Sequence, residues 1–238
     1  MEVRKGYKQT EVGVIPEDWE VKLNNELSEV KSGKRLPLGN TLSEEETKHP
    51  YIRVTDMFQG GVSVKEIKFV PEKVYPSIKN YRIYKDDIFI SVAGTLGIVG
   101  KIPIELDGAN LTENANRLTN ISCDRDFLLY FLSSTYIQNT IDAERTLGAQ
   151  PKLALIRIRN FQIPLPHNKS EQTTIATALS DAHALISSLE KLIEKKRAIK
   201  QGAMQELLRP KEGWMFDKVK NIASISNGAK NTQDKIDD

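Results

Sequence analysis

The sequence predicts a mixed α/β fold, an α+β globular domain followed by one long α-helix that forms a coiled coil. Residues 168–208 contain no proline and place apolar residues at intervals of three and four, which is typical of an amphipathic helix. Residues 1–167 instead carry short stretches that alternate apolar and polar residues, as strands do. The chain has 238 residues, 39% of them hydrophobic and 28% charged, which suits a domain of about 150 residues plus an extension.

The first third of the chain predicts a short helix and two strands. Residues 13–37 are expected to open with a proline turn and a tryptophan anchor, followed by a short helix and a break at Gly33. Residues 51–57, YIRVTDM, alternate and predict a strand with one apolar and one polar face. Residues 62–70, VSVKEIKFV, alternate in the same way and predict a second strand after a glycine turn.

The middle of the chain predicts the core of the domain. Residues 81–94 become mostly apolar after a polar turn, as expected of a central strand. Residues 95–106 predict a further strand, whose glycines indicate curvature or the close approach of a ligand. Residues 109–121 are expected to begin as a polar loop and end as a strand. Residues 124–147 place apolar residues at near-helical spacing and predict a core helix, and residues 148–166 then return to the surface.

The long helix carries signals at both ends. Asn168 and Glu171 resemble a capping box at its start, and Arg209-Pro210 closes its last turn. At 1.5 Å per residue the helix is roughly 60 Å long, more than a compact domain of this size spans.

An apolar stripe along this helix needs another surface to cover it. Lys196 falls on the stripe, where a lysine weakens pairing but can fix register. Burying about six apolar side chains at roughly 1.5 to 3 kcal/mol each is worth on the order of 10 kcal/mol, so we expect a homodimer through this helix. The alternative is a long helix that packs on its own domain. The residues predicted to make the dimer contact are Ala182, Leu185, Leu189, Leu192 and Ile199.

A sequence repeat flanks the domain and the helix. Residues 214–230, WMFDKVKNIASISNGAK, align without a gap on residues 19–35, WEVKLNNELSEVKSGKR, at an offset of 195 residues. Trp214 matches Trp19, and three apolar positions and one glycine also match. The repeat indicates a unit of globule plus helix, with a second copy that begins after the helix. The predicted domains are residues 1–167, 168–209 and 210–238, the last being the start of a truncated second domain.

Composition bounds the kind of protein. No apolar run approaches the 18 or so residues of a membrane span, and the N-terminus is too polar for a signal peptide, so we expect a cytoplasmic protein. The 34 basic and 32 acidic residues nearly balance, with 22 of each sign up to His167, so a DNA-binding face has to come from segregated charge. Cys123 is the only cysteine and the three histidines are scattered, so we expect neither an intrachain disulfide nor a metal site.

Catalytic motifs are poorly matched. Residues 94–102, GTLGIVGKI, resemble a phosphate-binding loop, but Thr95 stands where that loop needs glycine and Ile102 where it needs serine or threonine. Residues 16–18 and 29–31 only faintly resemble a nuclease carboxylate cluster, because Glu-x-Lys is common in so charged a chain. The sequence has no Asn-Pro-Pro-aromatic run and no Gly-x-Gly turn for a methyl donor. We therefore expect a protein without catalytic activity.

Polar residues that suit DNA are clustered in a few segments. Arginine can read guanine, asparagine can read adenine and acidic residues can accept from cytosine, while basic residues in a glycine loop suit phosphate. We expect base contacts from Arg53, Asn114 and Arg117 and phosphate contacts from Lys34 and Arg35. For any one residue the alternative is an ordinary solvated side chain. The predicted DNA-binding residues are Lys34, Arg35, Arg53, Thr55, Asp56, Lys101, Thr112, Asn114, Asn116 and Arg117.

Taken together, these segments resemble the specificity subunit of type I restriction-modification enzymes. The resemblance rests on IPEDWE at 15–20, YIRVTDM at 51–57, ISVAGTLGIVGKI at 90–102 and LTENANRL at 111–118. It rests above all on FQIPLP, EQ, IA and LEKLIEKKRAIKQGAMQELL within 161–208.

The resemblance implies a target-recognition domain that reads one half of a split DNA target, and a conserved helix that spaces two such domains. It implies a non-catalytic chain that binds methyltransferase (M) subunits, which carry S-adenosylmethionine, and restriction (R) subunits, which hydrolyse ATP, and that holds no cofactor itself. Full-length members have two recognition domains, so we expect a half-length or truncated specificity subunit. The alternative is a helix-mediated interaction or regulatory protein that has lost useful DNA binding.

Overall fold

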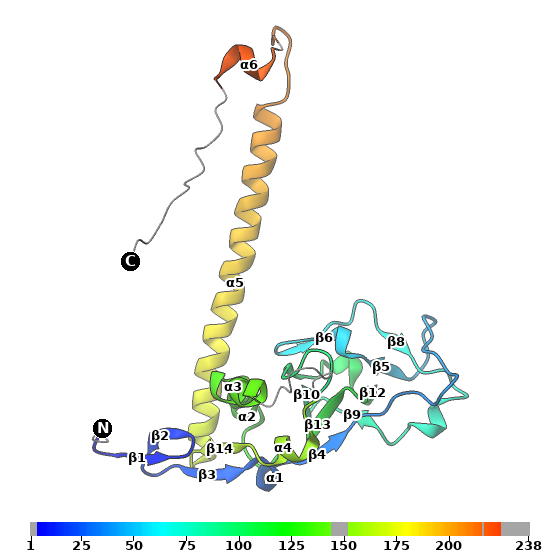
Figure 1. Cartoon of the computed structure of the whole chain (residues 1–238), viewed down its shortest axis with the longest axis vertical. Helices are drawn as coiled ribbons and strands as arrows, with labels where there is room; N and C mark the ends of the chain where they lie inside the picture. Colours follow the sequence, from blue (N-terminus) through cyan, green and yellow to red (C-terminus); the bar gives the residue numbers. More distant parts are fainter. Residues whose placement is uncertain (1–3, 144–151, 216, 225–238) are drawn as a thin grey trace, which may run out of the picture. The chain divides into compact units, whose positions relative to one another are not determined.

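The computed structural model describes residues 4–143, 152–215 and 217–224, and the chain divides into two units, Met1–Ala184 and Leu185–Asp238. The first unit holds the described strands and the start of the long helix, and the second holds the rest of that helix and one short helix. The first unit contains both strands and helices (Figure 1). The prediction of a mixed α/β domain followed by one long helix is therefore confirmed.

The central strand of the domain is β10 (Ile88–Ser91). It pairs antiparallel with β11 (Val99–Lys101) on one side and β13 (Ala115–Thr119) on the other, and β4 (Glu29–Ser32) extends the sheet beyond β13. All four residues of β10 are buried. The apolar run in residues 81–94 therefore marks a central strand, as predicted.

A second four-stranded sheet has the order β8-β5-β12-β9. Its strands are β5 (Pro50–Ile52), β8 (Lys68–Phe69), β9 (Arg82–Ile83) and β12 (Ala109–Leu111). All three residues of β12 are buried, so the polar loop predicted at the start of residues 109–121 is wrong. Asn110 lies inside the sheet because its side-chain amide donates a hydrogen bond of 2.8 Å to the carbonyl of Ile78.

The strand predicted over residues 51–57 is also partly wrong, because β5 ends at Ile52. A 3-10 turn, Val54–Asp56, follows it. The Asp56 Oδ2 atom accepts a hydrogen bond of 2.8 Å from the backbone N–H of Arg53, and this local bond competes with an extended strand.

Two further strands are shorter than predicted. Residues 62–70 hold only the end of β7 and the strand β8, and a 3-10 turn follows β11 within residues 95–106. A Cβ atom at Gly100 would lie 2.6 Å from the backbone nitrogen of Gly61, so this glycine lets a neighbouring hairpin approach β11. The bounds are β6 (Met57–Phe58) and β7 (Gly61–Val62), which form that hairpin, and the 3-10 turns Tyr75–Ser77 and Ile104–Leu106.

The core helix predicted over residues 124–147 is two helices in the structure, α2 (Arg125–Leu132) and α3 (Thr135–Ala143). Asp124 caps α2, since its Oδ1 atom accepts hydrogen bonds of 3.0 and 2.9 Å from two backbone N–H groups of the first turn. Residues 144–147 lie outside the described part of the chain.

The ends of the domain meet beside the long helix. The N-terminal hairpin is β1 (Tyr7–Thr10) with β2 (Gly13–Pro16), and the next elements are β3 (Glu20–Leu23), α1 (Asn24–Leu27), α4 (Leu155–Arg159) and β14 (Gln162–Leu165). β3 pairs antiparallel with β14, so the N-terminal segment lies against the residues that precede the long helix. The short helix predicted within residues 13–37 is α1, and Val30 of that range belongs to β4.

Two hydrophobic cores lie on opposite faces of the β10 sheet. Ile88 and Ile90 belong to the core that includes α2 and α3, whereas Phe89 belongs to the core that includes the second sheet. All three side chains are fully buried. Burying each of them stabilises the fold by roughly 1.5 to 3 kcal/mol.

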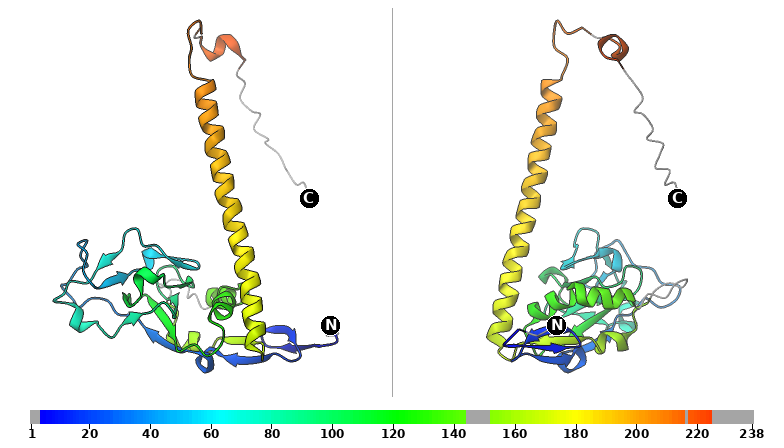
Figure 2. Two further views of the ribbon diagram at one scale, coloured as in Figure 1. Left: turned by 180° about the vertical axis from the view of Figure 1, so that it is seen from behind. Right: turned by 60° about the vertical axis from the view of Figure 1, so that its left-hand side comes forward.

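The long helix, α5, spans Lys169–Leu207 and confirms the helix predicted from periodicity. Asn168 caps it as predicted, because its Oδ1 atom accepts a hydrogen bond of 2.9 Å from the backbone N–H of Ser170. Helices α2 and α3 lie beside the first turns of α5, and the second sheet lies on the far side of the first unit from them (Figure 2). The described residues include no helix long and apolar enough to cross a membrane.

The short helix α6 (Val219–Ile222) begins 195 residues after α1, the same offset as the sequence repeat. The residues before the two helices have φ and ψ angles of −75° and 146° at Leu23 and −77° and 140° at Lys218. Both helices end in an extended residue that donates its N–H to the first helical carbonyl at 2.9 Å. The two segments therefore share a local backbone conformation as well as a sequence pattern.

Candidate nucleic-acid interface

The predicted DNA-binding residues are scattered over the domain, and three of them are buried. Asp56, Thr112 and Asn116 are 6%, 5% and 3% exposed. Such side chains have almost no surface to offer a duplex. The placement of these three residues is therefore at odds with the prediction that they contact DNA.

Arg53 is tied to the fold through Asp56. Its Nε and Nη2 atoms lie 3.0 and 2.5 Å from the two carboxylate oxygens of Asp56, and Nη2 also donates to the carbonyl of Glu66 at 2.8 Å. The hydrogen bonds to Asp56 raise the pKa of the Arg53 guanidinium above its usual range. Because these contacts already use donors of the guanidinium, Arg53 stabilises the 3-10 turn that contains Thr55.

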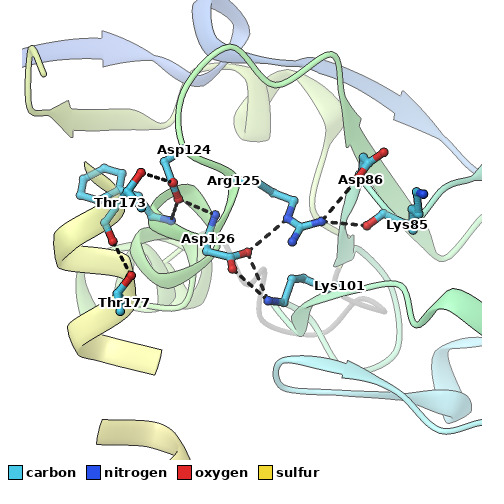
Figure 3. Close-up of polar contacts among 9 residues, drawn as sticks. Lys85, Asp86, Lys101, Asp124, Arg125, Asp126, Thr173 and Thr177 are labelled. Carbon is cyan, nitrogen blue, oxygen red and sulfur yellow. Dashed lines mark hydrogen bonds and ion pairs between the residues drawn. The ribbon is translucent and has the colours of Figure 1, made fainter. Parts of the chain in front are cut away.

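Lys101 also has a partner within the domain. Its Nζ atom lies 3.1 Å from Asp126 Oδ2, and the Nε atom of Arg125 donates to Asp126 Oδ1 at 3.1 Å (Figure 3). Burial alone raises the pKa of the Asp126 carboxyl, but hydrogen bonds and charge from Lys101 and Arg125 outweigh it and lower that pKa. Arg125 also donates to the carbonyl of Lys85 at 2.9 Å, so this group joins α2 to β11 and to the turn between β9 and β10.

A second polar group joins the start of α5 to the cap of α2. The Oγ1 atom of Thr173 donates to Asp124 Oδ2 at 2.8 Å (Figure 3). The Gln172 side chain accepts the backbone N–H of Asp124 at 2.8 Å and donates to the carbonyl of Pro166 at 2.8 Å. Gln172 is 4% exposed; its bond to Pro166 is buried and its bond to Asp124 is part-buried.

Trp19 completes the attachment of α5. Its Nε1 atom donates to Glu171 Oε1 at 3.2 Å, and its ring packs edge-on against Phe127 with centroids 6.2 Å apart. Glu171 was expected to complete the capping box, and in the structure its carboxylate binds the tryptophan. The sequence predicted a tryptophan anchor and a capping box that includes Glu171, but it did not predict the contacts of Trp19 with Glu171 or of Gln172 with Asp124.

The remaining predicted residues lie at the surface. Lys34, Arg35 and Thr55 are exposed, and Asn114 and Arg117 are half-buried. The Arg117 Nη2 atom donates to the carbonyl of Asn80 at 3.4 Å. These five residues keep atoms that a ligand can reach.

The predicted dimer contact lies on an uncovered face of α5. Leu185, Leu189, Leu192 and Ile199 are 60%, 48%, 49% and 55% exposed, and Ala182 is also exposed. Large apolar side chains exposed together mark an interaction surface.

In the described part of the chain, no three histidine, cysteine, aspartate or glutamate side chains are grouped to hold a metal ion.

Comparison with known proteins gives the family. The sequence matches the model of the type I restriction modification DNA specificity domain over residues 16–201. Two relatives from Methanocaldococcus jannaschii are the putative type I restriction enzyme MjaX specificity subunit, 28% identical over 215 residues, and the type I restriction enzyme MjaVIII specificity subunit, 28% identical over 214 residues. The alignments cover 85% and 87% of this chain but 48% and 49% of the relatives. The chain thus spans about half the length of these curated relatives.

Solved structures share the fold. A chain from work on complex assembly and conformational transition of the type I R-M system has a TM-score of 0.64 and 18% identity, over 82% of this chain and 45% of that one. The HsdS subunit from Thermoanaerobacter tengcongensis has a TM-score of 0.54 and 17% identity, over 80% of this chain and 43% of that one. The family match covers most of the domain and most of α5. The chain therefore belongs to the family of type I restriction modification DNA specificity domains.

Proposed function

We propose that the chain is a sequence-specific, DNA-binding specificity subunit of a type I restriction-modification enzyme. The observation that carries the proposal is the extent of the family match, which runs from residue 16 to residue 201 and so includes both the domain and most of α5. In this proposal residues 1–167 recognise one DNA half-site and residues 168–209 space and pair the subunits. The repeat supports assigning residues 210–238 to the start of a second recognition domain.

The chain itself is proposed to be non-catalytic and to direct other subunits to DNA. Methyltransferase subunits would supply S-adenosylmethionine chemistry and restriction subunits would supply ATP hydrolysis, so this chain needs no cofactor. The exposed leucines of α5 support a homodimer through the helix, which would place two recognition domains on a bipartite target.

The DNA contacts are proposed from residues that remain accessible. Lys34 and Arg35 are exposed and suit phosphate, and Asn114 and Arg117 are half-buried and suit base edges or backbone. Asp56, Thr112 and Asn116 are left out because they are buried.

Selection from a random duplex library by the full chain tests this function. We expect enrichment of one sequence motif, and binding whose logarithm falls linearly with the logarithm of salt concentration, because phosphate contacts release counterions. Binding without any enriched sequence would contradict a specificity function. A failure to bind duplex DNA at low salt would favour the alternative, a helix-mediated interaction or regulatory protein, which the exposed face of α5 also suits.

A further inference from the structure

The edge of the second sheet carries two cation–ring pairs on one short segment. The Arg82 guanidinium lies over the ring of Tyr84 with its carbon 5.4 Å from the ring centroid, and the Lys34 ammonium lies over the ring of Tyr81 at 5.7 Å. β9, which contains Arg82, is the last strand in the order β8-β5-β12-β9. Both pairs therefore lie at a sheet edge rather than over its buried faces.

The chain segment that carries the two tyrosines is anchored in the core, while the cations of both pairs can be reached from solvent. Tyr84 is 40% exposed and Lys34 is exposed, while Tyr81 and Arg82 are half-buried. Ile83, between the two rings, is fully buried and fixes the segment in the core. The rings are thus held in place while the cations remain accessible.

Arg117 adds a third positive charge close to Arg82 and Tyr84. Its Nη2 atom donates to the carbonyl of Asn80 at 3.4 Å, and its buried Nη1 atom has no hydrogen-bond partner within the described residues. The acidic group facing it is Asp87, which is 4% exposed and whose Oδ2 atom accepts the backbone N–H of Tyr84 at 2.9 Å. Burial raises the pKa of the Asp87 carboxyl and lowers that of the Arg117 guanidinium.

A guanidinium held over an aromatic ring is already partly oriented, so less side-chain entropy is lost when its N–H groups bind an oxygen ligand. Two such cations on one edge suit a row of phosphates better than a single small anion. We propose that Arg82, held by Tyr84, and Lys34, held by Tyr81, contact the phosphate backbone of duplex DNA. The inference rests on the proposed DNA-binding function and adds Arg82, Tyr81 and Tyr84 to the residues that the sequence singled out.

The test measures binding of the full chain to a fluorescent duplex of random sequence over a series of salt concentrations. Each of Arg82→Ala and Lys34→Ala should weaken binding severalfold and reduce the steepness of the log–log salt dependence by about one. Tyr84→Ala should weaken binding, whereas Tyr84→Phe keeps the ring and should bind like the unmodified protein. Lys22→Ala is the matched control, since Lys22 is a surface cation of β3 that pairs with Glu20 at 3.4 Å.

Further results distinguish a failure of this inference from a failure of the proposed function. Where Arg82→Ala unfolds in a thermal melt, Lys34→Ala and Tyr84→Ala still test the proposal, and Arg82→Lys, which keeps the charge, should keep the salt dependence. Salt-dependent binding that is unchanged in Arg82→Ala and Lys34→Ala would overturn this inference and leave the proposed function standing. An unmodified protein without salt-dependent binding would overturn the proposed function and, with it, this inference.

Discussion

The side chain of Gln172 joins the backbone of Asp124 to that of Pro166. It accepts a hydrogen bond from the first and donates one to the second, each at 2.8 Å, and it is 4% exposed. Asp124 caps α2, and Pro166 directly follows β14. One buried amide thus attaches the first turn of α5 to two elements of the domain.

Replacing Gln172 with leucine should destabilise the domain by about 2 to 4 kcal/mol, because it leaves a part-buried N–H and a buried carbonyl without their partner. Urea unfolding of the two proteins measures the difference. Gln172→Glu separates the two bonds: it keeps the acceptor for Asp124, loses the donor for Pro166, and should destabilise as well. A loss below about 0.5 kcal/mol in the leucine variant would mean that water replaces both bonds.

The ion pairs of Asp126 should make stability depend on pH in acid. Its pKa is lower in the folded chain than the ordinary value of 3.8, so the stabilisation is fully present above 3.8 and is lost as pH falls through the folded value. Asp126→Asn should therefore be less stable than the unmodified protein at pH 6, and this difference should shrink below pH 3.8. Solvent screens the pair, since the side chain is 35% exposed, so we expect a difference of at most about 1 kcal/mol.

Denaturant unfolding at a series of pH values measures this difference. Asp86→Asn is the control, because Asp86 is 82% exposed and lies 3.8 Å from Arg125. It should change stability less than Asp126→Asn at neutral pH. A stability difference for Asp126→Asn that grows toward low pH would contradict the assigned direction of the shift.

The homodimer proposed through α5 predicts a mass of about twice the 26.8 kDa of one chain in light scattering at micromolar concentration. Leu189→Lys or Leu192→Lys should give monomers, because either variant places a charge in an apolar contact. Gln201→Lys adds the same charge about half a turn away from the stripe and should leave the dimer intact. A monomeric unmodified protein would contradict the dimer.

Some elements of the fold could be predicted from the sequence because their local pattern of apolar residues is enough to identify them. The apolar run of β10 and the periodicity of α5 each identify one element without knowledge of its neighbours. Asn110 looked like a loop residue, and only its bond to Ile78, 32 positions away, explains how it fits inside a sheet. The strand prediction for residues 51–57 was partly wrong for a local reason, because the Asp56 carboxylate accepts a hydrogen bond from the backbone N–H of Arg53.

The candidate interface was harder to predict than the fold. Charge alone does not distinguish Lys34, which is exposed, from Lys101, whose partner Asp126 is 25 positions away. Arg82 has no motif around it, and its place at a sheet edge depends on a strand order that the sequence does not reveal. Residue type therefore identifies candidate DNA-binding residues, and contacts between residues far apart in the sequence decide which of these candidates remain accessible.

Deleting residues 213–238 should shift the melting temperature by less than about 2 °C and leave DNA binding unchanged. The repeat gives this segment the pattern of residues 19–35, but Trp214 is 47% and Ile222 73% exposed, whereas Leu27 is 4% exposed. Exposed side chains contribute little to stability. Phe216 and Ile225, the other predicted matches, lie outside the described residues. Thermal melts and duplex titrations of both chains provide the measurement, and a large loss of either property would make the segment a working part of the fold.

A homodimer of this chain should recognise an interrupted palindrome. Two identical recognition domains related by a two-fold axis present the same contacts to both half-sites, so the half-sites must be inverted copies of each other. With both domains on one face of the duplex, we expect half-site centres about one helical turn, roughly 34 Å, apart. Methylation mapping of DNA after co-expression with the methyltransferase subunit of the same system reads the target directly. Leu189→Lys should abolish methylation of that target while Gln201→Lys preserves it, and a target made of two unrelated half-sites would refute the symmetric dimer.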